Sequence, residues 1–239
     1  MSPKITLYTD HGCPFSHRVH ITLDELNLKY EEVIIDLNTP RPQWYLDINP
    51  RGLVPSIKYS VPDLLDEEIV TESAIVCQFL CDSYPSNLLP ASKESPTSAL
   101  TRARMHFFCD TWATKVSTFQ FAVMRAEASE KESKAEEWAA VIEKDIEPLL
   151  ANANPFFGGS KELTFAEVLT APFLLRVYTF AKDGELIPSS FTKKLDALPN
   201  FSRWKKAVEQ HENVLRIYDE KKTVDDTKAK LKSMQAAKK

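Results

Sequence analysis

The sequence predicts an α/β domain followed by an all-helical domain. In the first 85 residues, short apolar runs and helical stripes alternate in the order βαβ and then ββα. From residue 97 onward the apolar residues recur at helical spacing. A chain of 239 residues has room for one or two domains. We therefore expect an α/β domain at 1–85, a proline-containing linker at 86–96, a helical domain at 97–220, and a charged tail at 221–239 for which the sequence predicts disorder.

The α/β domain begins with a strand at residues 4–9, where apolar and polar side chains alternate. A helix then begins at Pro14, since proline suits the first turn of a helix, where its missing N–H costs nothing. A short buried strand at 30–37 follows, and a strand, a helix and a strand in so short a stretch indicate parallel pairing. After a connector at 39–52, we expect two more strands at 54–59 and 68–70 and a helix at 72–84.

The helical domain is predicted to begin with a long helix at 100–129 and a second helix at 132–152. Thr164 and Glu167 form a T-x-x-E capping box, which marks the start of a third helix. A fourth helix is expected at 200–213.

Composition excludes several classes of function. The net charge of −4 disfavours a general affinity for nucleic acid, and with only 5 glycines the chain has no phosphate-binding glycine loop. No apolar run reaches the roughly 20 residues that span a bilayer, so no membrane partner is expected. The N-terminus lacks a basic segment followed by an apolar stretch, so we expect no secretory signal and a cytoplasmic location.

Three of the four cysteines have the surroundings of core residues. Cys77 and Cys81 lie one helical turn apart among apolar neighbours, and Cys109 follows two phenylalanines. Two thiols without a nearby pair of histidines make a poor zinc site, so no metal is expected. Cytosolic thiols stay reduced, which argues against a structural disulfide.

Cys13 differs from these three because it lies between Gly12 and Pro14, where the first strand turns into the first helix. Amide groups and the positive end of the helix dipole favour a thiolate at such a position. The alternative is a cysteine that only precedes the helix and has no chemical role. His11 and His17 flank it, and we expect both to be ordinary polar residues.

Four motifs together resemble the cytosolic glutathione transferases over about residues 4–215. They are G-C-P-F-S at 12–16, G-L-V-P at 52–55, E-S-A-I at 72–75, and the T-x-x-E box. C-P-F is similar to the omega-type branch, whose members use cysteine, whereas S-H-R-V-H-I-T-L after it is similar to the plant tau-type enzymes, which use serine. The resemblance implies a thioredoxin-like domain before the helical domain, glutathione as co-substrate, and a homodimer.

The resemblance also implies a glutathione site in the first domain. Val54 would pair with the tripeptide through its main chain, just before a cis peptide bond at Pro55. Glu72 would accept a hydrogen bond from the γ-glutamyl amine, and Ser73 would bind its carboxylate. The full set of glutathione-binding residues expected on this basis is Cys13, Phe15, Arg41, Val54, Pro55, Glu72 and Ser73, with Arg41 at the glycyl end.

The second substrate is expected in an apolar pocket between the domains. Its predicted lining is Met105, Phe108, Trp112 and Arg176, with Phe15, Tyr178 and Trp204 as further candidates. Because most aromatic residues at helical spacing belong to a core, a packing role for them stays open. Arg176 is the exception, since a charge among apolar neighbours needs a partner or a cleft.

Three functions remain open at this stage. Cys13 would perform glutathione-dependent thiol transfer or a dehydroascorbate-type reduction through a mixed disulfide; Ser16 stands in place of the second cysteine of a C-x-x-C motif, which implies a one-thiol route. Alternatively, the protein conjugates glutathione to apolar electrophiles, with the hydroxyl of Ser16 or Tyr8 assisting. The third alternative is a non-catalytic relative that binds glutathione or another ligand, or regulates a partner protein.

Overall fold

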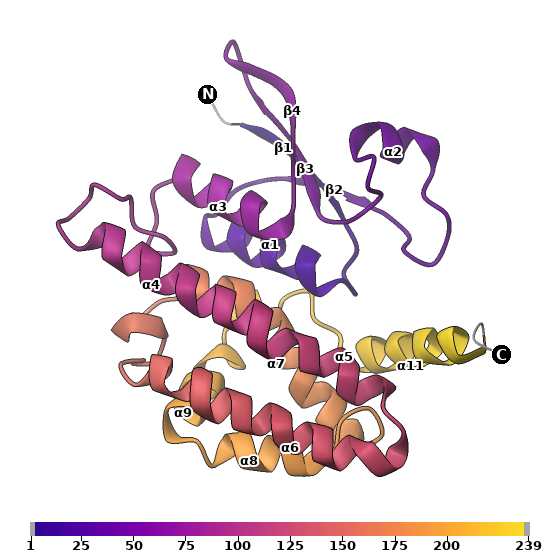
Figure 1. Cartoon of the computed structure of the whole chain (residues 1–239). Coiled ribbons are helices and arrows are strands. Elements are labelled where there is room, and N and C mark those ends of the chain that lie inside the picture. The colour runs from indigo at the N-terminus through magenta and orange to yellow at the C-terminus, as the bar shows by residue number, and fades with distance from the viewer. Residues whose placement is uncertain (1–2, 237–239) are drawn as a thin grey trace. The chain divides into compact units, whose positions relative to one another are not determined.

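The computed structural model describes residues 3–236, and the chain divides into two compact units with the boundary between Leu89 and Pro90. This boundary falls inside the predicted linker at 86–96. The first two residues of the predicted α/β domain and the last three of the predicted tail, 237–239, lie outside the described residues. Each unit is described by itself below (Figure 1).

The N-terminal unit is built on a four-stranded mixed sheet with the strand order β2-β1-β3-β4. The central strand β1 pairs in parallel with β2 and antiparallel with β3, and β3 pairs antiparallel with β4. This topology confirms the βαβ–ββα order expected from the sequence. The elements are β1 (Lys4–Thr9), α1 (Pro14–Glu25), β2 (Glu31–Ile34), α2 (Gln43–Ile48), β3 (Ser56–Val61), β4 (Leu65–Thr71) and α3 (Ser73–Ser83).

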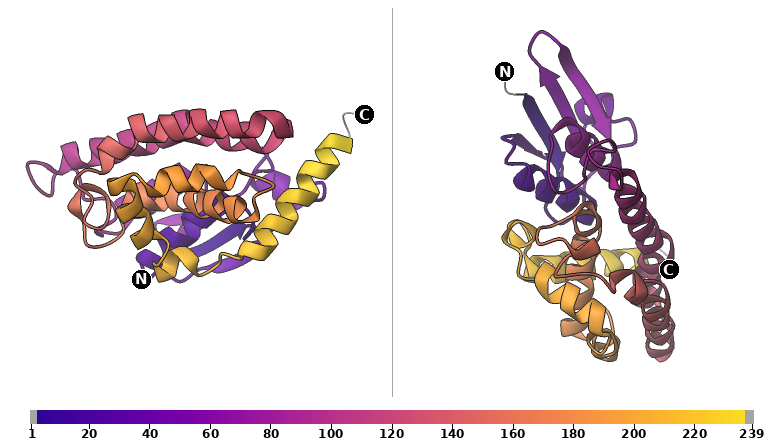
Figure 2. Two further views of the ribbon diagram at one scale, coloured as in Figure 1. Left: turned by 90° about the horizontal axis from the view of Figure 1, so that it is seen from below. Right: turned by 90° about the vertical axis from the view of Figure 1, so that its left-hand side faces the viewer.

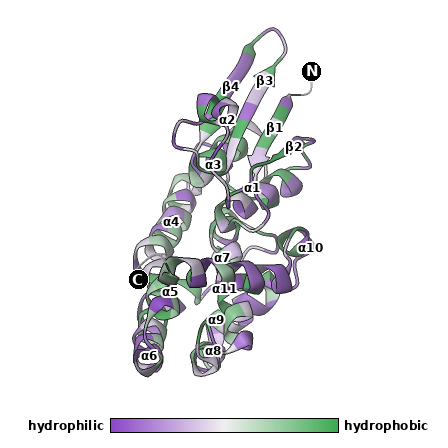
Figure 3. Ribbon diagram, turned by 90° about the vertical axis from the view of Figure 1, so that its right-hand side faces the viewer, coloured by the Kyte–Doolittle hydropathy of each residue, from purple (hydrophilic) through white to green (hydrophobic). Residues whose placement is uncertain are grey.

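Side chains of β1 alternate between the two faces of the sheet, because successive residues of a strand point in opposite directions. Ile5 and Leu7 are fully buried on one face. Tyr8 points to the other face, where it packs against Tyr45 of α2 with ring centroids 5.6 Å apart. Figure 3 shows the alternation as green and purple bands along β1 and β3. Figure 1 shows α1 and α3 side by side, with α2 apart from them.

Two expectations for the N-terminal unit need correction. The strand predicted as buried at 30–37 is the shorter edge strand β2, and Ile34 is 57% exposed, because β2 has a neighbour on one side only. The segment predicted as a connector at 39–52 contains the short helix α2, which was not predicted.

The C-terminal unit is helical, as predicted, although several helix boundaries differ. The long helix expected at 100–129 is interrupted by a π-helical turn at Trp112–Val116, and the single helix expected at 200–213 is two helices. One short helix was not predicted at all. The helices are α4 (Ser98–Thr111), α5 (Ser117–Arg125), α6 (Ala128–Asp145), α7 (Phe165–Asp183), α8 (Ser189–Asp196), α9 (Pro199–Val208), α10 (Glu212–Leu215) and α11 (Glu220–Ala236), with 3-10 turns at Glu147–Leu150 and Phe157–Gly159.

The predicted capping box at the start of α7 is confirmed. The Thr164 amide and hydroxyl donate to the Glu167 carboxylate at 2.9 and 2.7 Å. The same carboxylate also accepts from the Phe157 amide at 2.9 Å and from the indole N–H of Trp204 at 2.6 Å. Glu167 is fully buried, so one side chain links the start of α7 to the 3-10 turn before it and to α9.

The disorder predicted for the tail from residue 221 is wrong, because residues 220–236 form α11 (yellow in Figure 2), which runs at an angle to the other helices of this unit. The Lys228 ammonium contacts the carboxylates of Asp183 and Glu185 at 2.7 and 2.6 Å. Just before α11, the Tyr218 hydroxyl donates to Thr179 of α7 at 2.8 Å. Lys228, a charged residue of the predicted tail, therefore forms ion pairs at the end of α7 and just beyond it. Among residues 3–236, no helix combines the length and apolar character needed to cross a bilayer.

Glu167→Ala should lower the free energy of unfolding by about 3 kcal/mol or more, because each buried donor left without its acceptor costs about 1–3 kcal/mol. Urea unfolding followed by circular dichroism measures the change. Glu143→Ala, an exposed glutamate of α6 in the same unit, is the matched control and should stay within about 0.5 kcal/mol of the parent. Equal losses in the two variants would contradict a structural role for Glu167.

Candidate functional site

Cys13 is the residue that precedes α1, and a tight turn fixes its position. Its amide donates to the Asp10 carbonyl at 3.0 Å, and its carbonyl accepts from the His17 amide at 3.1 Å, which begins the helix. The Asp10 carboxylate accepts from the Gly12 amide at 2.8 Å. Pro14 favours the start of α1 at this point, because the backbone N–H that proline lacks has no partner in the first turn of a helix. Cys13 therefore lies at the amide end of a helix of 12 residues.

The Cys13 thiol is half-buried, with its sulfur 3.8 Å from the Val54 carbonyl oxygen. It packs against a cluster of buried side chains from β1, α2 and the segment before β3. Cys77 contrasts with it: burial raises the pKa of the Cys77 thiol to about 12, so Cys77 is inert at neutral pH. Cys81 is also buried, so Cys13 is the accessible thiol of the N-terminal unit within the described residues.

The structure places neither alternative hydroxyl where a ligand reaches it easily. Ser16 is fully buried, and its oxygen accepts from the Asp10 amide at 3.5 Å. Tyr8 is 6% exposed and belongs to the cluster that supports Cys13. Both hydroxyl-bearing residues therefore have structural roles in this unit.

The segment before β3 presents its backbone next to Cys13. The Val54–Pro55 peptide bond is cis, as the resemblance implies. The Leu53 carbonyl accepts from the Tyr45 hydroxyl at 2.6 Å and from the Asn49 side-chain amide at 2.8 Å. Burial raises the pKa of Tyr45, so its hydroxyl stays protonated and donates at neutral pH. Sequence analysis missed Tyr45 and Asn49, because nothing in the local pattern reports a contact with Leu53.

Glu72 and Ser73 lie at the start of α3. Glu72 adopts a φ of 68°, a region that residues other than glycine rarely occupy, and its carboxylate pairs with the Arg51 guanidinium at the surface. Ser73 is buried and its hydroxyl accepts from Arg18 of α1 at 3.1 Å. Arg18 also lies over the Phe15 ring, with its guanidinium carbon 5.2 Å from the centroid. Sequence analysis did not select Arg18, because its burial and its contact with Ser73 depend on packing between helices that the local sequence does not report.

Phe15 is 45% exposed at the first turn of α1, where an accessible ring fits the predicted role in binding. Arg41 is placed differently from the prediction. Its guanidinium donates to the carbonyls of Gly52, Asp36 and Leu37 at 3.0, 2.7 and 3.3 Å, and also to Thr39. Four backbone acceptors therefore occupy Arg41, which fastens the loop after β2. This arrangement favours a structural role over contact with a carboxylate.

The four residues predicted to line a co-substrate pocket are buried within the helical unit. Phe108 and Trp112 belong to an aromatic core, with the Phe108 ring centroid 4.9 Å from that of Phe157 and 5.8 Å from that of Trp204. Met105 is 4% exposed. This packing corrects the prediction for Phe108, Trp112 and Trp204, whose helical spacing reflects a core.

Arg176 has the partner that a buried charge requires. It is 3% exposed, and its guanidinium donates to the Pro172 carbonyl at 2.8 Å and lies 5.2 Å from the Tyr218 ring centroid. Tyr178 is also buried and donates to Asp196 at 2.9 Å. Both side chains thus hold α7 to neighbouring segments.

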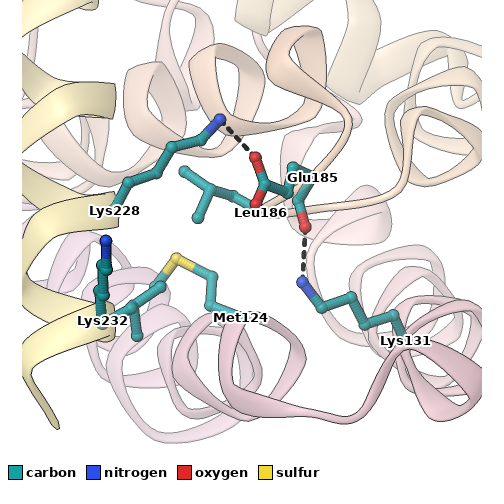
Figure 4. Close-up of a pocket in the computed structure, with 7 residues that line it drawn as sticks. Met124, Lys131, Glu185, Leu186, Lys228 and Lys232 are labelled. Atoms are coloured by element: carbon teal, nitrogen blue, oxygen red, sulfur yellow. Dashed lines mark hydrogen bonds and ion pairs between the residues drawn. The ribbon is translucent and has the colours of Figure 1, made fainter. Parts of the chain in front are cut away.

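A pocket of about 330 Å³ does occur in the helical unit, at a different place (Figure 4). Lys131 and Lys228 line it, and both contact Glu185, through its carbonyl and its carboxylate respectively. None of the predicted co-substrate residues lines this pocket. The remaining lining residues are Met124, Leu186, Leu231 and Lys232. Because three lysines and a glutamate line it beside its three apolar residues, it is more polar than the pocket expected for an electrophile.

Comparison with known proteins identifies the N-terminal unit first. The family model described as the glutathione S-transferase N-terminal domain matches residues 7–88. Glutathione S-transferase omega-1 of Mus musculus is 27% identical over 174 residues, which cover 73% of this chain and 67% of the mouse protein. A match of that length is longer than either unit alone, so it extends over parts of both.

Two solved structures cover nearly the whole chain. Glutathione transferase Omega 1C from Trametes versicolor has a TM-score of 0.75 and 24% identity, and covers 95% of this chain and 96% of its own. Rice GST1, solved in complex with glutathione, has a TM-score of 0.81 and 22% identity, and covers 98% of each chain. At 24% and 22% sequence identity, these two structural similarities establish the fold alone.

The fold, the cysteine at the helix start and the cis-proline segment beside it therefore agree with the match of residues 7–88 to the glutathione S-transferase N-terminal domain, and the chain as a whole has the fold of the glutathione transferases. The similarity to the mouse omega-1 protein agrees with the C-P-F motif, which resembles the omega-type branch.

Tyr45→Phe should loosen the segment that carries Val54. Loss of the hydroxyl leaves the Leu53 carbonyl with Asn49 as its remaining side-chain donor, and should lower the free energy of unfolding by about 1 kcal/mol. Hydrogen exchange at residues 52–54 should become faster. Tyr59→Phe, which removes a hydroxyl bonded to Tyr84 elsewhere in the unit, should leave that exchange unaltered. Unchanged exchange in Tyr45→Phe would disprove the anchoring role.

Proposed function

We propose that this protein is a glutathione transferase of the omega-like type, which performs glutathione-dependent thiol transfer and reduction through a mixed disulfide at Cys13. The observation that carries the proposal is the half-buried thiol at the start of α1, beside the backbone of a cis-proline segment. Similarity to glutathione S-transferase omega-1 of Mus musculus supports the same chemistry. Glutathione as co-substrate is supported by the rice relative, which was solved with glutathione bound.

The reaction follows from the accessible Cys13 thiol of the N-terminal unit. The Cys13 thiolate attacks the glutathione sulfur of a mixed disulfide; a disulfide forms between Cys13 and glutathione, and the substrate leaves as a thiolate and takes up a proton. A second glutathione, after losing its proton, attacks this disulfide, releases oxidised glutathione and restores the Cys13 thiolate. Ser16 carries no thiol, so the second step must use glutathione.

Amides of the first helical turn suit this chemistry, because they lack partners within the helix and favour negative charge on a sulfur placed at that end. Exchange through a thiolate therefore requires no neighbouring base. His11 is bonded to Glu32 at 2.6 Å and His17 is fully buried, so neither needs to act on the thiol.

Glutathione is assigned to the surface formed by Phe15, Val54 and the start of α3. The main chain of Val54 pairs with the tripeptide, Glu72 accepts from its amine, and Ser73 binds its γ-glutamyl carboxylate. The Arg18 guanidinium adds positive charge next to Ser73. The strained backbone of Glu72 supports this assignment, because such conformations cluster at ligand-binding positions.

Conjugation to an electrophile is less well supported, because it would need a hydroxyl donor and both Ser16 and Tyr8 are buried. The omega-like assignment also implies a homodimer, a cytoplasmic location and a part in detoxification. These three points remain predictions from the resemblance.

Incubation of the intact protein with oxidised glutathione should add one glutathione, and peptide mapping by mass spectrometry should place it at Cys13. Cys13→Ser should lose both the adduct and the turnover of a glutathione mixed disulfide, because a hydroxyl at that position is not ionised at neutral pH. Cys109→Ser, which changes a half-buried thiol of the helical unit, should keep both. Full activity in Cys13→Ser would rule out this mechanism.

Ser73→Ala should weaken glutathione binding by about 10-fold or more, since a hydrogen bond to a charged group contributes roughly 1.5–3 kcal/mol. Isothermal titration calorimetry measures the dissociation constant directly. Ser83→Ala is the control, because it removes a hydroxyl at the other end of the same helix, where it donates to Phe79. If the two variants bind glutathione equally well, the assignment of Ser73 fails.

A further inference from the structure

A second cluster of reactive side chains lies on the other side of the turn that holds Cys13. His11 precedes Cys13 by two residues, His20 lies on α1, and Glu32 lies on β2. One ligand atom from each residue falls within 4.8 Å of the other two. The sequence could not predict this cluster, because its members are separated along the chain and meet only when β1 pairs with β2.

We propose that His11, His20 and Glu32 form a binding site for a divalent transition-metal ion, with zinc as the ion that fits best. Two imidazoles and one carboxylate with room for a water are an established donor set for tetrahedral zinc. Such a site holds its ligand atoms roughly 3.3 Å apart, as follows from metal–ligand distances near 2.0 Å. From the 4.8 Å that bounds the three separations, the widest must therefore shorten by up to about 1.5 Å, whereas the His11–Glu32 pair must open slightly from 2.6 Å.

The burial of the three side chains allows these movements of the ligand atoms. The side chains of His11 and Glu32 are 43% and 30% exposed, so an ion reaches them from solvent and both have room to rotate. They already contact each other, with the His11 Nε2 atom 2.6 Å from the Glu32 carboxylate. His20 is fully buried and provides the fixed member of the set.

The surroundings of His20 resemble those of a metal ligand. Its Nε2 atom lies 2.9 Å from the Thr9 hydroxyl, and its Nδ1 atom lies 2.9 Å from the Tyr30 hydroxyl. When one ring nitrogen binds the ion, the hydroxyl at the other nitrogen keeps its hydrogen bond and orients the ring, as ligating histidines require. The displaced hydroxyl turns to another partner or to water.

Cys13 is not expected to be a fourth ligand. Thr9 and Tyr8 are adjacent on β1 and so point to opposite faces. His20 contacts Thr9, whereas Cys13 packs with the cluster around Tyr8. The ion would instead join the turn before α1, the middle of α1 and β2.

The test uses the full chain without a histidine tag. Titration with zinc should give one site by calorimetry, and cobalt should give visible d–d bands without the charge-transfer band of a cobalt thiolate. Cys13→Ser should bind zinc as the parent does. His11→Ala and Glu32→Gln should each weaken zinc binding by more than about 10-fold.

Glu31→Gln is the matched control for Glu32→Gln, since it makes the same change on an exposed neighbour in β2 and should leave binding unaltered. Equal zinc affinity in the parent, His11→Ala and Glu32→Gln would overturn the proposal. A thiolate charge-transfer band that disappears in Cys13→Ser would also overturn it, because the ion would then be bound through Cys13. His11 and Glu32 lie at the surface, so neither substitution should unfold the protein. Thermal melting of the metal-free variants checks this.

Discussion

The turn from Asp10 to Cys13 is the constraint on which the site depends. Two hydrogen bonds to Asp10, from the amides of Gly12 and Cys13, close it, and the Asp10 amide in turn reaches Ser16 in the first turn of α1. The direction of α1 is therefore set by the end of β1. A thiol fixed in this way lies at the amide end of a helix, next to backbone N–H groups that have no partner within the helix.

The backbone of the segment before β3 is part of the proposed glutathione site, and neighbouring side chains hold that backbone in place. Tyr45 and Asn49 both donate to the Leu53 carbonyl, and Arg41 donates to Gly52. These contacts fasten residues 52 and 53, which directly precede Val54. Arg41 therefore fixes the loop after β2, and its predicted contact with the glycyl end of glutathione stays a prediction.

Local patterns in the sequence predicted the fold well, because strand alternation, helix starts and capping involve residues close together in the chain. The capping box of Thr164 and Glu167 is such a case, and so is the helix start at Pro14. What the sequence could not supply was partners distant in the chain. Lys228 appeared to be part of a solvated tail until its pairing with Asp183 was visible, and Phe108 appeared to line a pocket until its contact with Phe157 placed it in the core. The site divides in the same way: motifs selected Cys13, Val54 and Ser73, whereas Arg18 and Tyr45 depend on contacts across the fold.

Side chains of β1 alternate between the two faces of the sheet, and this alternation separates the Cys13 thiol from the proposed metal site. Tyr8 leads to the face where the sulfur of Cys13 lies, and Thr9 leads to the face where His20 meets His11 and Glu32. A soft sulfur nucleophile and a harder nitrogen and oxygen donor set are thereby kept apart, although only one residue separates His11 from Cys13. Because His11 belongs to the turn that positions the thiol, an ion bound there would restrain the same backbone that Asp10 holds. The proposed metal site and the proposed reaction therefore act on one structural element from opposite sides.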